Sequence, residues 1–175
     1  MGESLVHGGA VSAGLIIIRL ALGLMLMTHG LNKFFGTGGI SGTARWFEGL
    51  GLRPGRLHAW IAATTEIGAG ALVSLGLLFP APCAAFVGLM TVAGLTDHRG
   101  KGFFVFKGGW EYVAFVGLIA VALAFLGPGQ WSLDALVGLK LYGLGWGLAA
   151  LVVGVIAGVG TVSGFRRPIA QEESS

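Results

Sequence analysis

The sequence has one cysteine and few charged residues. Cys83 is the only cysteine among 175 residues, so this sequence offers no intramolecular disulfide, CxxC redox pair or cysteine zinc cluster. We interpret Cys83 as a small apolar packing residue. Only 11% of the residues are charged, compared with about 25% in an ordinary soluble domain. This composition excludes an ordinary soluble domain.

Several motifs for metals and cofactors are also absent. The sequence has no HExxH zinc motif, no GxxxxGK[ST] phosphate loop and no CxxCH haem-attachment motif. The glycine-rich run 36–42 lacks the GxGxxG spacing of dinucleotide-binding sites. Haem held by His29 and His98 is compatible with the sequence but disfavoured. We therefore predict no metal site and no intrinsic cofactor.

The chain is rich in hydrophobic residues and glycine. Hydrophobic residues make up 54% of the sequence and there are 33 glycines, with a mean hydropathy of +0.82. A membrane-spanning helix needs about 20 apolar residues, and small residues let such helices approach closely. The sequence predicts an all-α, polytopic membrane protein, with spans at residues 11–31, 59–79, 83–96, 110–126 and 141–164.

The predicted organisation is a four-helix transmembrane bundle followed by a fifth, C-terminal transmembrane helix. Its parts are an N-terminal tail (1–10), the bundle (11–136), the additional helix (137–164) and a polar tail (165–175). The prolines of the turn 79–82 are predicted to end the second span, because proline lacks a backbone donor. Residues 43–50 are predicted to form a surface helix that stops at Gly51, and Ser132 is predicted to cap a short interfacial helix over 131–140.

The basic residues indicate the orientation of the predicted spans. With five spans, the loops 32–58 and 97–109 share one side with the C-terminus, and the opposite side carries only Lys140. By the positive-inside rule the basic side is cytoplasmic, which places the N-terminus outside. The spread of these residues along loops argues against nucleic-acid binding. They are Lys33, Arg45, Arg53, Arg56, Arg99, Lys101, Lys107, Arg166 and Arg167.

Glu66 is a carboxylate within an apolar span. An ionised side chain at that depth costs roughly 2.5–3.5 kcal/mol on insertion scales. One interpretation is a proton-exchanging carboxylate or a hydrogen-bond acceptor for a ligand. The other is a neutral glutamic acid bonded to a neighbouring helix. We favour a functional role, because ionisable residues inside membranes usually have one.

The first span carries three cationic or titratable residues. At about 100° per residue, Arg19, His29 and Lys33 are predicted to share one polar stripe. Arg19 is predicted to be the counter-charge of Glu66. The stripe forms either a cationic wall for an anion, a quinone head group or a carboxylate, or a structural bridge to Glu66 with Lys33 reaching the interface.

His98 and Glu111 lie at the ends of the third and fourth spans. His98 could hold a ligand, relay a proton or sit at the water boundary. The helix dipole adequately explains Glu111, which is in the first turn of its helix. With Glu66, His29 and Lys33, these residues are predicted to line a pocket open to the cytoplasmic leaflet.

The order of several short motifs resembles the DoxX family of small bacterial membrane proteins. The resemblance covers roughly residues 15–136 and implies a four-helix membrane bundle. Some relatives form part of a thiosulfate:quinone oxidoreductase, and others belong to membrane complexes that handle thiol and superoxide stress. The matching segments are Arg19 to Gly23, His29 to Lys33, Trp60 to Gly70, Gly76-Leu77, His98, Gly109 to Glu111 and Gly127 to Asp134.

The resemblance and the polar residues together suggest a membrane subunit of a quinone-linked oxidoreductase or redox-stress complex. Quinone is the expected ligand, and electrons would come from a soluble redox enzyme on the cytoplasmic side of the bacterial inner membrane. The alternatives are a small proton-coupled transporter or channel that uses Glu66, and a non-catalytic scaffold for a soluble redox enzyme. The chain alone or a homo-oligomer could serve any of these functions.

Overall fold

The computed structural model describes residues 2–167, and helices dominate this part of the chain. The predicted all-α class is confirmed for it, with one isolated β-bridge between Leu52 and Arg166. The elements are α1 (Gly2–Phe35), α2 (Gly39–Gly49), α3 (Gly55–Leu75), α4 (Pro80–Leu95), η1 (Val105–Lys107), α5 (Glu111–Leu126), α6 (Leu133–Leu136) and α7 (Leu144–Phe165). Helix α1 exceeds the predicted span 11–31 at both ends and takes in most of the predicted tail.

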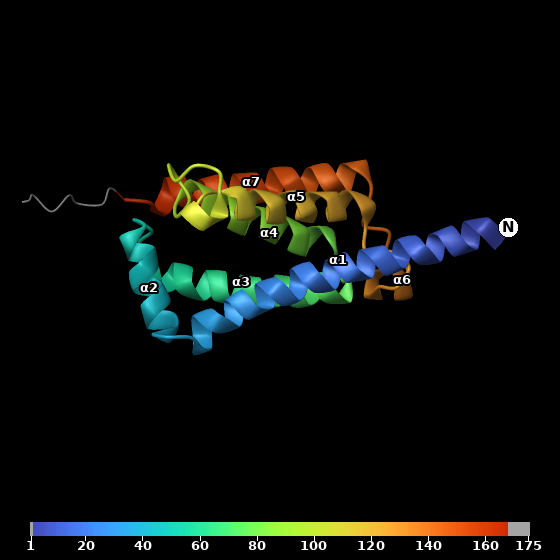
Figure 1. Ribbon diagram of the computed structural model, residues 1–175, viewed down its shortest axis with the longest axis horizontal. Coiled ribbons are helices and arrows are strands. Elements are labelled where there is room, and N and C mark those ends of the chain that lie inside the picture. Colours follow the sequence, from blue (N-terminus) through green and yellow to red (C-terminus); the bar gives the residue numbers. More distant parts are fainter. Residues whose placement is uncertain (1, 168–175) are drawn as a thin grey trace, which may run out of the picture.

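The long helices form two layers (Figure 1). Helices α1 and α3 pack together in one layer, and α4, α5 and α7 form the other. Successive long helices run in opposite directions, and α2 lies across one end of the first layer. We call this the α2 end, and the opposite end, where the N-terminus and α6 lie, the α6 end.

Backbone contacts at the α2 end join segments far apart in the sequence. The Arg53 amide donates to the Phe165 carbonyl at 3.1 Å, and the Arg167 amide donates to the Gly51 carbonyl at 2.8 Å. An Arg166 guanidinium nitrogen lies 3.3 Å from the Leu95 carbonyl oxygen. The first long loop, the end of α4 and the end of α7 therefore lie together, as the five-span prediction requires.

Two helices are long and apolar enough to cross a membrane by length and composition. They are Gly8–Phe35 within α1, and α7. Helices α4 and α5 are apolar but have 16 residues each, or about 24 Å at 1.5 Å per residue. The hydrocarbon core of a bilayer is about 30 Å thick. Crossing by α1 and α7 is supported, and crossing by α3, α4 and α5 remains a prediction.

Glycines allow the closest approaches between helices. A Cβ atom on Gly70 of α3 would lie 2.6 Å from the Gly23 carbonyl oxygen of α1, and one on Gly154 of α7 would lie 2.6 Å from the Ala84 carbonyl oxygen of α4. Such contacts leave no room for a larger side chain. Helix α7 is thus an integral part of the second layer, packed on α4 and α5.

The predicted role of the prolines at the end of the second span is wrong. Helix α3 ends at Leu75, and Gly76 follows in the left-handed conformation with φ of 66°. The Leu77 amide donates to the Leu72 carbonyl at 3.0 Å, as in a Schellman ending. Pro80 instead begins α4, where its missing amide proton costs nothing.

The two short helices agree better with the sequence. Helix α2 covers most of the predicted 43–50 but starts earlier, at Gly39, and Gly51 follows its end with φ of 87°. Helix α6 is shorter than predicted. The predicted cap of α6 is confirmed, because the Ser132 hydroxyl accepts a hydrogen bond from the Ala135 amide at 3.2 Å.

Candidate functional site

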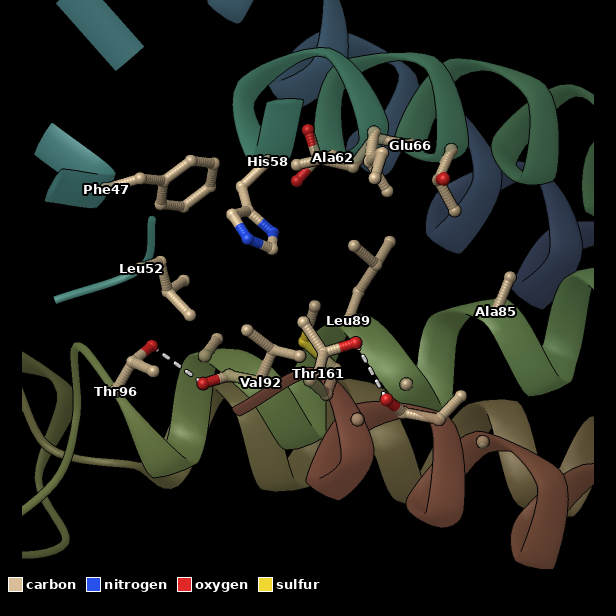
Figure 2. A pocket seen from close by; sticks show the side chains of 18 of the residues that line it. Phe47, Leu52, His58, Ala62, Glu66, Ala85, Leu89, Val92, Thr96 and Thr161 are labelled. Atoms are coloured by element: carbon tan, nitrogen blue, oxygen red, sulfur yellow. Dashed lines mark hydrogen bonds between the residues drawn. The ribbon is translucent and has the colours of Figure 1, made fainter. Parts of the chain in front are cut away.

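A cavity of about 470 Å³ lies between the two layers at the α2 end. Its walls come mainly from α3 on one side and from α4 and α7 on the other, and α2 and the segment after it close one flank. Figure 2 shows Ala62 of α3 across from Leu89 and Val92 of α4, with Ala85 further along. Most of the lining is apolar, which suits the body of an apolar or amphiphilic molecule.

A largely buried ion pair forms part of this wall. Lys33, near the end of α1, donates from Nζ to both carboxylate oxygens of Glu66 on α3, at 2.7 Å and 2.6 Å. The two side chains are 14% and 9% exposed. Both residues line the cavity, so a charged pair is held within otherwise apolar surroundings. Such a pair needs good geometry to offset the loss of hydration, and this one has it.

Arg19 is not the counter-charge of Glu66, and that prediction is wrong. Its Nη2 donates to the Trp131 carbonyl at 2.9 Å and lies 3.5 Å from the Ser74 carbonyl oxygen. Its Nη1 donates to the carbonyl of Pro128. Lys33 lies about 21 Å further along α1 at 1.5 Å per residue. Helix α3 runs antiparallel to α1, so Arg19 is level with the end of α3 rather than with Glu66.

Near Arg19, at the α6 end, Asp134 holds another backbone segment in place. The buried Asp134 carboxylate accepts from the Leu78 amide at 2.8 Å and from the Phe79 amide at 3.1 Å. The Asp134 amide donates to the Gly76 carbonyl at 2.9 Å. Asp134 thus fixes the turn between α3 and α4. Sequence reasoning assigned Asp134 no role beyond its place in a family-like segment.

His58 lines the cavity and is a residue that sequence reasoning missed. Its side chain is 6% exposed, and its Nε2 is buried with no hydrogen-bond partner. Figure 2 shows its ring directed into the space between Phe47 and Leu89. The edge of the ring packs against Phe165, with ring centroids 5.0 Å apart.

A sequence signal for His58 does exist. His58 and Glu66 stand four residues on either side of Ala62, and residues four apart share a helix face. His58 stands just before the predicted span 59–79, and a histidine at the boundary of a span is only a weak indication of function. Burial lowers the pKa of His58, and a hydrogen bond with the Arg53 backbone opposes this shift. The neutral ring is therefore favoured.

His98 also lines the cavity, just after the end of α4. Its Nδ1 donates to the Gly108 carbonyl at 2.7 Å, which ties the end of α4 to the loop before α5. Its Nε2 lies 3.8 Å from a carboxylate oxygen of Asp97, another lining residue. His98 thus has a structural partner on one nitrogen and faces a carboxylate with the other.

The remaining predicted site residues do not line this cavity. His29 Nε2 is 3.4 Å from the Tyr112 hydroxyl, and His29 is near enough to Glu66 for their charges to interact. A Glu111 carboxylate oxygen accepts from the Val105 amide at 3.0 Å and so holds the loop before α5. Of the six candidates, the structure brings Lys33, Glu66 and His98 to one cavity. Arg19, His29 and Glu111 are placed elsewhere. Among residues 2–167, no group of three histidine, cysteine or acidic residues could hold a metal ion.

Comparison with known proteins gives one match. Residues 14–99 match the family model described as DoxX. The matched segment contains most of α1, all of α2, α3 and α4, and the Lys33–Glu66 pair. It ends before α5 and α7. No curated protein and no solved structure matches the chain.

Proposed function

Because the chain belongs to the DoxX family, we propose that it is an integral membrane subunit of a quinone-linked oxidoreductase or redox-stress complex. The cavity at the α2 end binds a quinone-like amphiphile. One observation carries this proposal: an apolar cavity of about 470 Å³ has the Lys33–Glu66 ion pair in its wall. Ligand sites of this kind combine apolar walls with a few well-placed polar groups.

The lining matches the two parts of a quinone. The apolar side chains of α4 and α7 contact the ring and tail, and the polar wall of α3 faces the ring oxygens. The Lys33 ammonium has three donors and the Glu66 carboxylate has further lone pairs, so the pair can serve a carbonyl or a hydroxyl. Glu66 and His98 are the groups that would exchange protons with the reduced ligand.

The electrons come from a partner in this proposal. The sequence carries no recognised motif for a metal, haem or dinucleotide, so a soluble redox enzyme supplies the electrons. We place the α2 end in the cytoplasm of a bacterium, because it carries most of the basic residues. The partner then docks at the α2 end, beside the cavity.

The direct test is to purify the full-length protein in mild detergent, extract it with organic solvent and measure quinones by liquid chromatography and mass spectrometry. We expect co-purified quinone in the native protein and less of it in the Glu66→Gln variant. Glu111→Gln is the matched control, because the Glu111 carboxylate holds a loop and lies off the cavity. Its quinone content should equal that of the native protein.

Two results together would contradict quinone binding in this cavity. If no quinone co-purifies, and if membranes carrying Glu66→Gln reduce quinone at the native rate, the cavity is not a quinone site. The ion pair would then serve the bundle alone.

A further inference from the structure

The Nε2 atom of His58 is a polar atom that the protein buries but leaves without a partner. A buried nitrogen without a hydrogen bond is unfavourable, and such groups in native structures call for an explanation. This nitrogen belongs to a side chain that lines the cavity. Figure 2 shows the ring between Phe47 and Leu89, facing the space that the lining residues surround.

A purely structural role does not account for this arrangement. His98, in the same cavity, places its Nδ1 2.7 Å from the Gly108 carbonyl oxygen and so has a protein partner. The Phe165 ring packs against the His58 ring, and a hydrogen bond joins the ring to the Arg53 backbone. Because Nε2 has no partner, that bond uses Nδ1, and neither contact involves Nε2. Nε2 is therefore the atom that the structural contacts of His58 leave unexplained.

We propose that His58 binds the ligand, with Nε2 making a hydrogen bond to one oxygen of its head group while the Lys33–Glu66 pair meets a second oxygen. This inference rests on the proposed function and narrows the ligand class. The cavity takes a cyclic amphiphile with two oxygen functions on different sides of the ring. A molecule with one polar end, such as a fatty acid or a simple alcohol, would leave one of the two polar groups unpaired.

Imidazole suits such a ligand in both of its redox forms. The neutral ring has one donor nitrogen and one acceptor nitrogen, and the tautomer decides which is which. In His58 the Arg53 backbone already takes the donor nitrogen, so Nε2 of the neutral ring is an acceptor. It can accept a hydrogen bond from a ring hydroxyl of the reduced ligand, and it can donate to a ring carbonyl of the oxidised ligand when the imidazole is protonated. Ala62 stands between His58 and Glu66 on the same face of α3, and its small side chain leaves the space between the two polar groups open.

The test compares two probes with the same carbon skeleton. Menadiol, the reduced form of menadione, carries two ring hydroxyls, and 2-methylnaphthalene carries none. Binding to the purified full-length protein is measured by anaerobic equilibrium dialysis, with equal detergent in both chambers. We expect the native protein to prefer menadiol by tenfold or more, and His58→Phe to lose about tenfold in menadiol affinity, as for one hydrogen bond to a buried partner.

Two variants control this measurement. His58→Gln keeps a side-chain acceptor near the position of Nε2 and should retain most of the menadiol affinity. Tyr142→Phe removes a polar group from an exposed ring that does not line this cavity, and should bind like the native protein. If His58→Phe does not fold, His58→Met replaces it as a variant without a ring nitrogen.

Each outcome decides between the two proposals. If the native protein prefers menadiol and His58→Phe binds it equally well, the role of His58 is overturned and the proposed function is kept. If the native protein does not distinguish menadiol from 2-methylnaphthalene, both are overturned. If the preference is lost in His58→Phe and kept in His58→Gln and Tyr142→Phe, both are supported.

Discussion

At the scale of single residues, the buried charges have two different kinds of partner. Lys33 and Glu66 neutralise each other inside the cavity wall. Arg19 is 1% exposed and directs its hydrogen bonds to carbonyl oxygens at the α6 end. The first arrangement leaves donors and acceptors for a ligand, and the second uses the charge to hold backbone segments together.

The Lys33–Glu66 pair should show strong coupling in stability. Glu66→Leu alone leaves a buried ammonium without a counter-charge, which typically costs about 3–5 kcal/mol. Lys33→Leu alone leaves the Glu66 carboxylate without its counter-charge. We expect the double variant to be less destabilised than the sum of the two single variants. Unfolding of the detergent-solubilised protein in a double-mutant cycle measures this coupling, and additive effects would contradict it.

Replacement of Arg19 should affect stability without affecting the cavity. Arg19→Leu removes the donors that join α1 to the carbonyls of Ser74 and Trp131, and leaves those buried acceptors with fewer partners. We expect a loss of about 2 kcal/mol or more in unfolding free energy, with unchanged quinone content after purification. The thermal midpoint and the extracted quinone are measured on the same sample. Lost quinone in a well-folded Arg19→Leu protein would show that Arg19 acts on the cavity after all.

The residue scale also shows how far sequence reasoning reaches. The cost of a charge in an apolar span singled out Glu66 correctly for attention. Helical periodicity gives the angle of Arg19 around α1, but the level at which it meets α3 depends on where the intervening loop and α2 place that helix. The sequence alone therefore could not predict the partner of Glu66, nor that a nitrogen of His58 lacks a partner.

At the scale of elements, α7 shows that glycine spacing alone does not identify an interface. The sequence offers three GxxxG pairs in this region, and the structure uses their members unequally. Gly154 and Gly158 are buried against α4, whereas a Cβ atom on Gly160 or Gly164 would meet nothing within 4 Å. Which face of α7 packs inward is fixed by its partners, which the local sequence does not reveal.

A matched pair of substitutions tests this packing. Gly154→Val places its side chain against the Ala84 carbonyl and Val87, and overpacking of this kind typically costs about 1–3 kcal/mol. Gly160→Val points into open space and should change stability by less than about 0.5 kcal/mol. Thermal unfolding of the two variants in the same detergent gives the comparison. Equal losses would mean that α7 packs on α4 through another face.

At the scale of the whole molecule, the distribution of charge predicts an orientation. The loop before α3, the loop before α5 and the end of α7 gather at the α2 end. These segments carry six of the nine basic residues outside α1, and Arg45 in α2 and Arg56 in the first turn of α3 lie at the same end. The α6 end carries Lys140. The positive-inside rule then predicts that the α2 end, where the cavity lies, faces the cytoplasm.

Cysteine labelling in intact bacterial cells tests the orientation. Cys83→Ala provides the background, with single cysteines at Thr37, in the exposed loop before α2, or at Val137, which follows α6. A thiol reagent that does not cross membranes should label Val137→Cys and leave Thr37→Cys unlabelled until the cells are opened. The reverse pattern would mean that the protein has the opposite orientation in the membrane, with its partner outside the cytoplasm.

The crossing of α1 and α3 has a consequence for sequence variation. A side chain on Gly23 or Gly70 would collide with the backbone of the opposite helix, whereas Gly14 and Gly68 face open space. In an alignment of relatives, positions 23 and 70 should keep glycine, and positions 14 and 68 should drift to alanine, serine or leucine. If the family keeps its cavity, the two fixed glycines should be retained even where the tail and the loops have diverged beyond comparison.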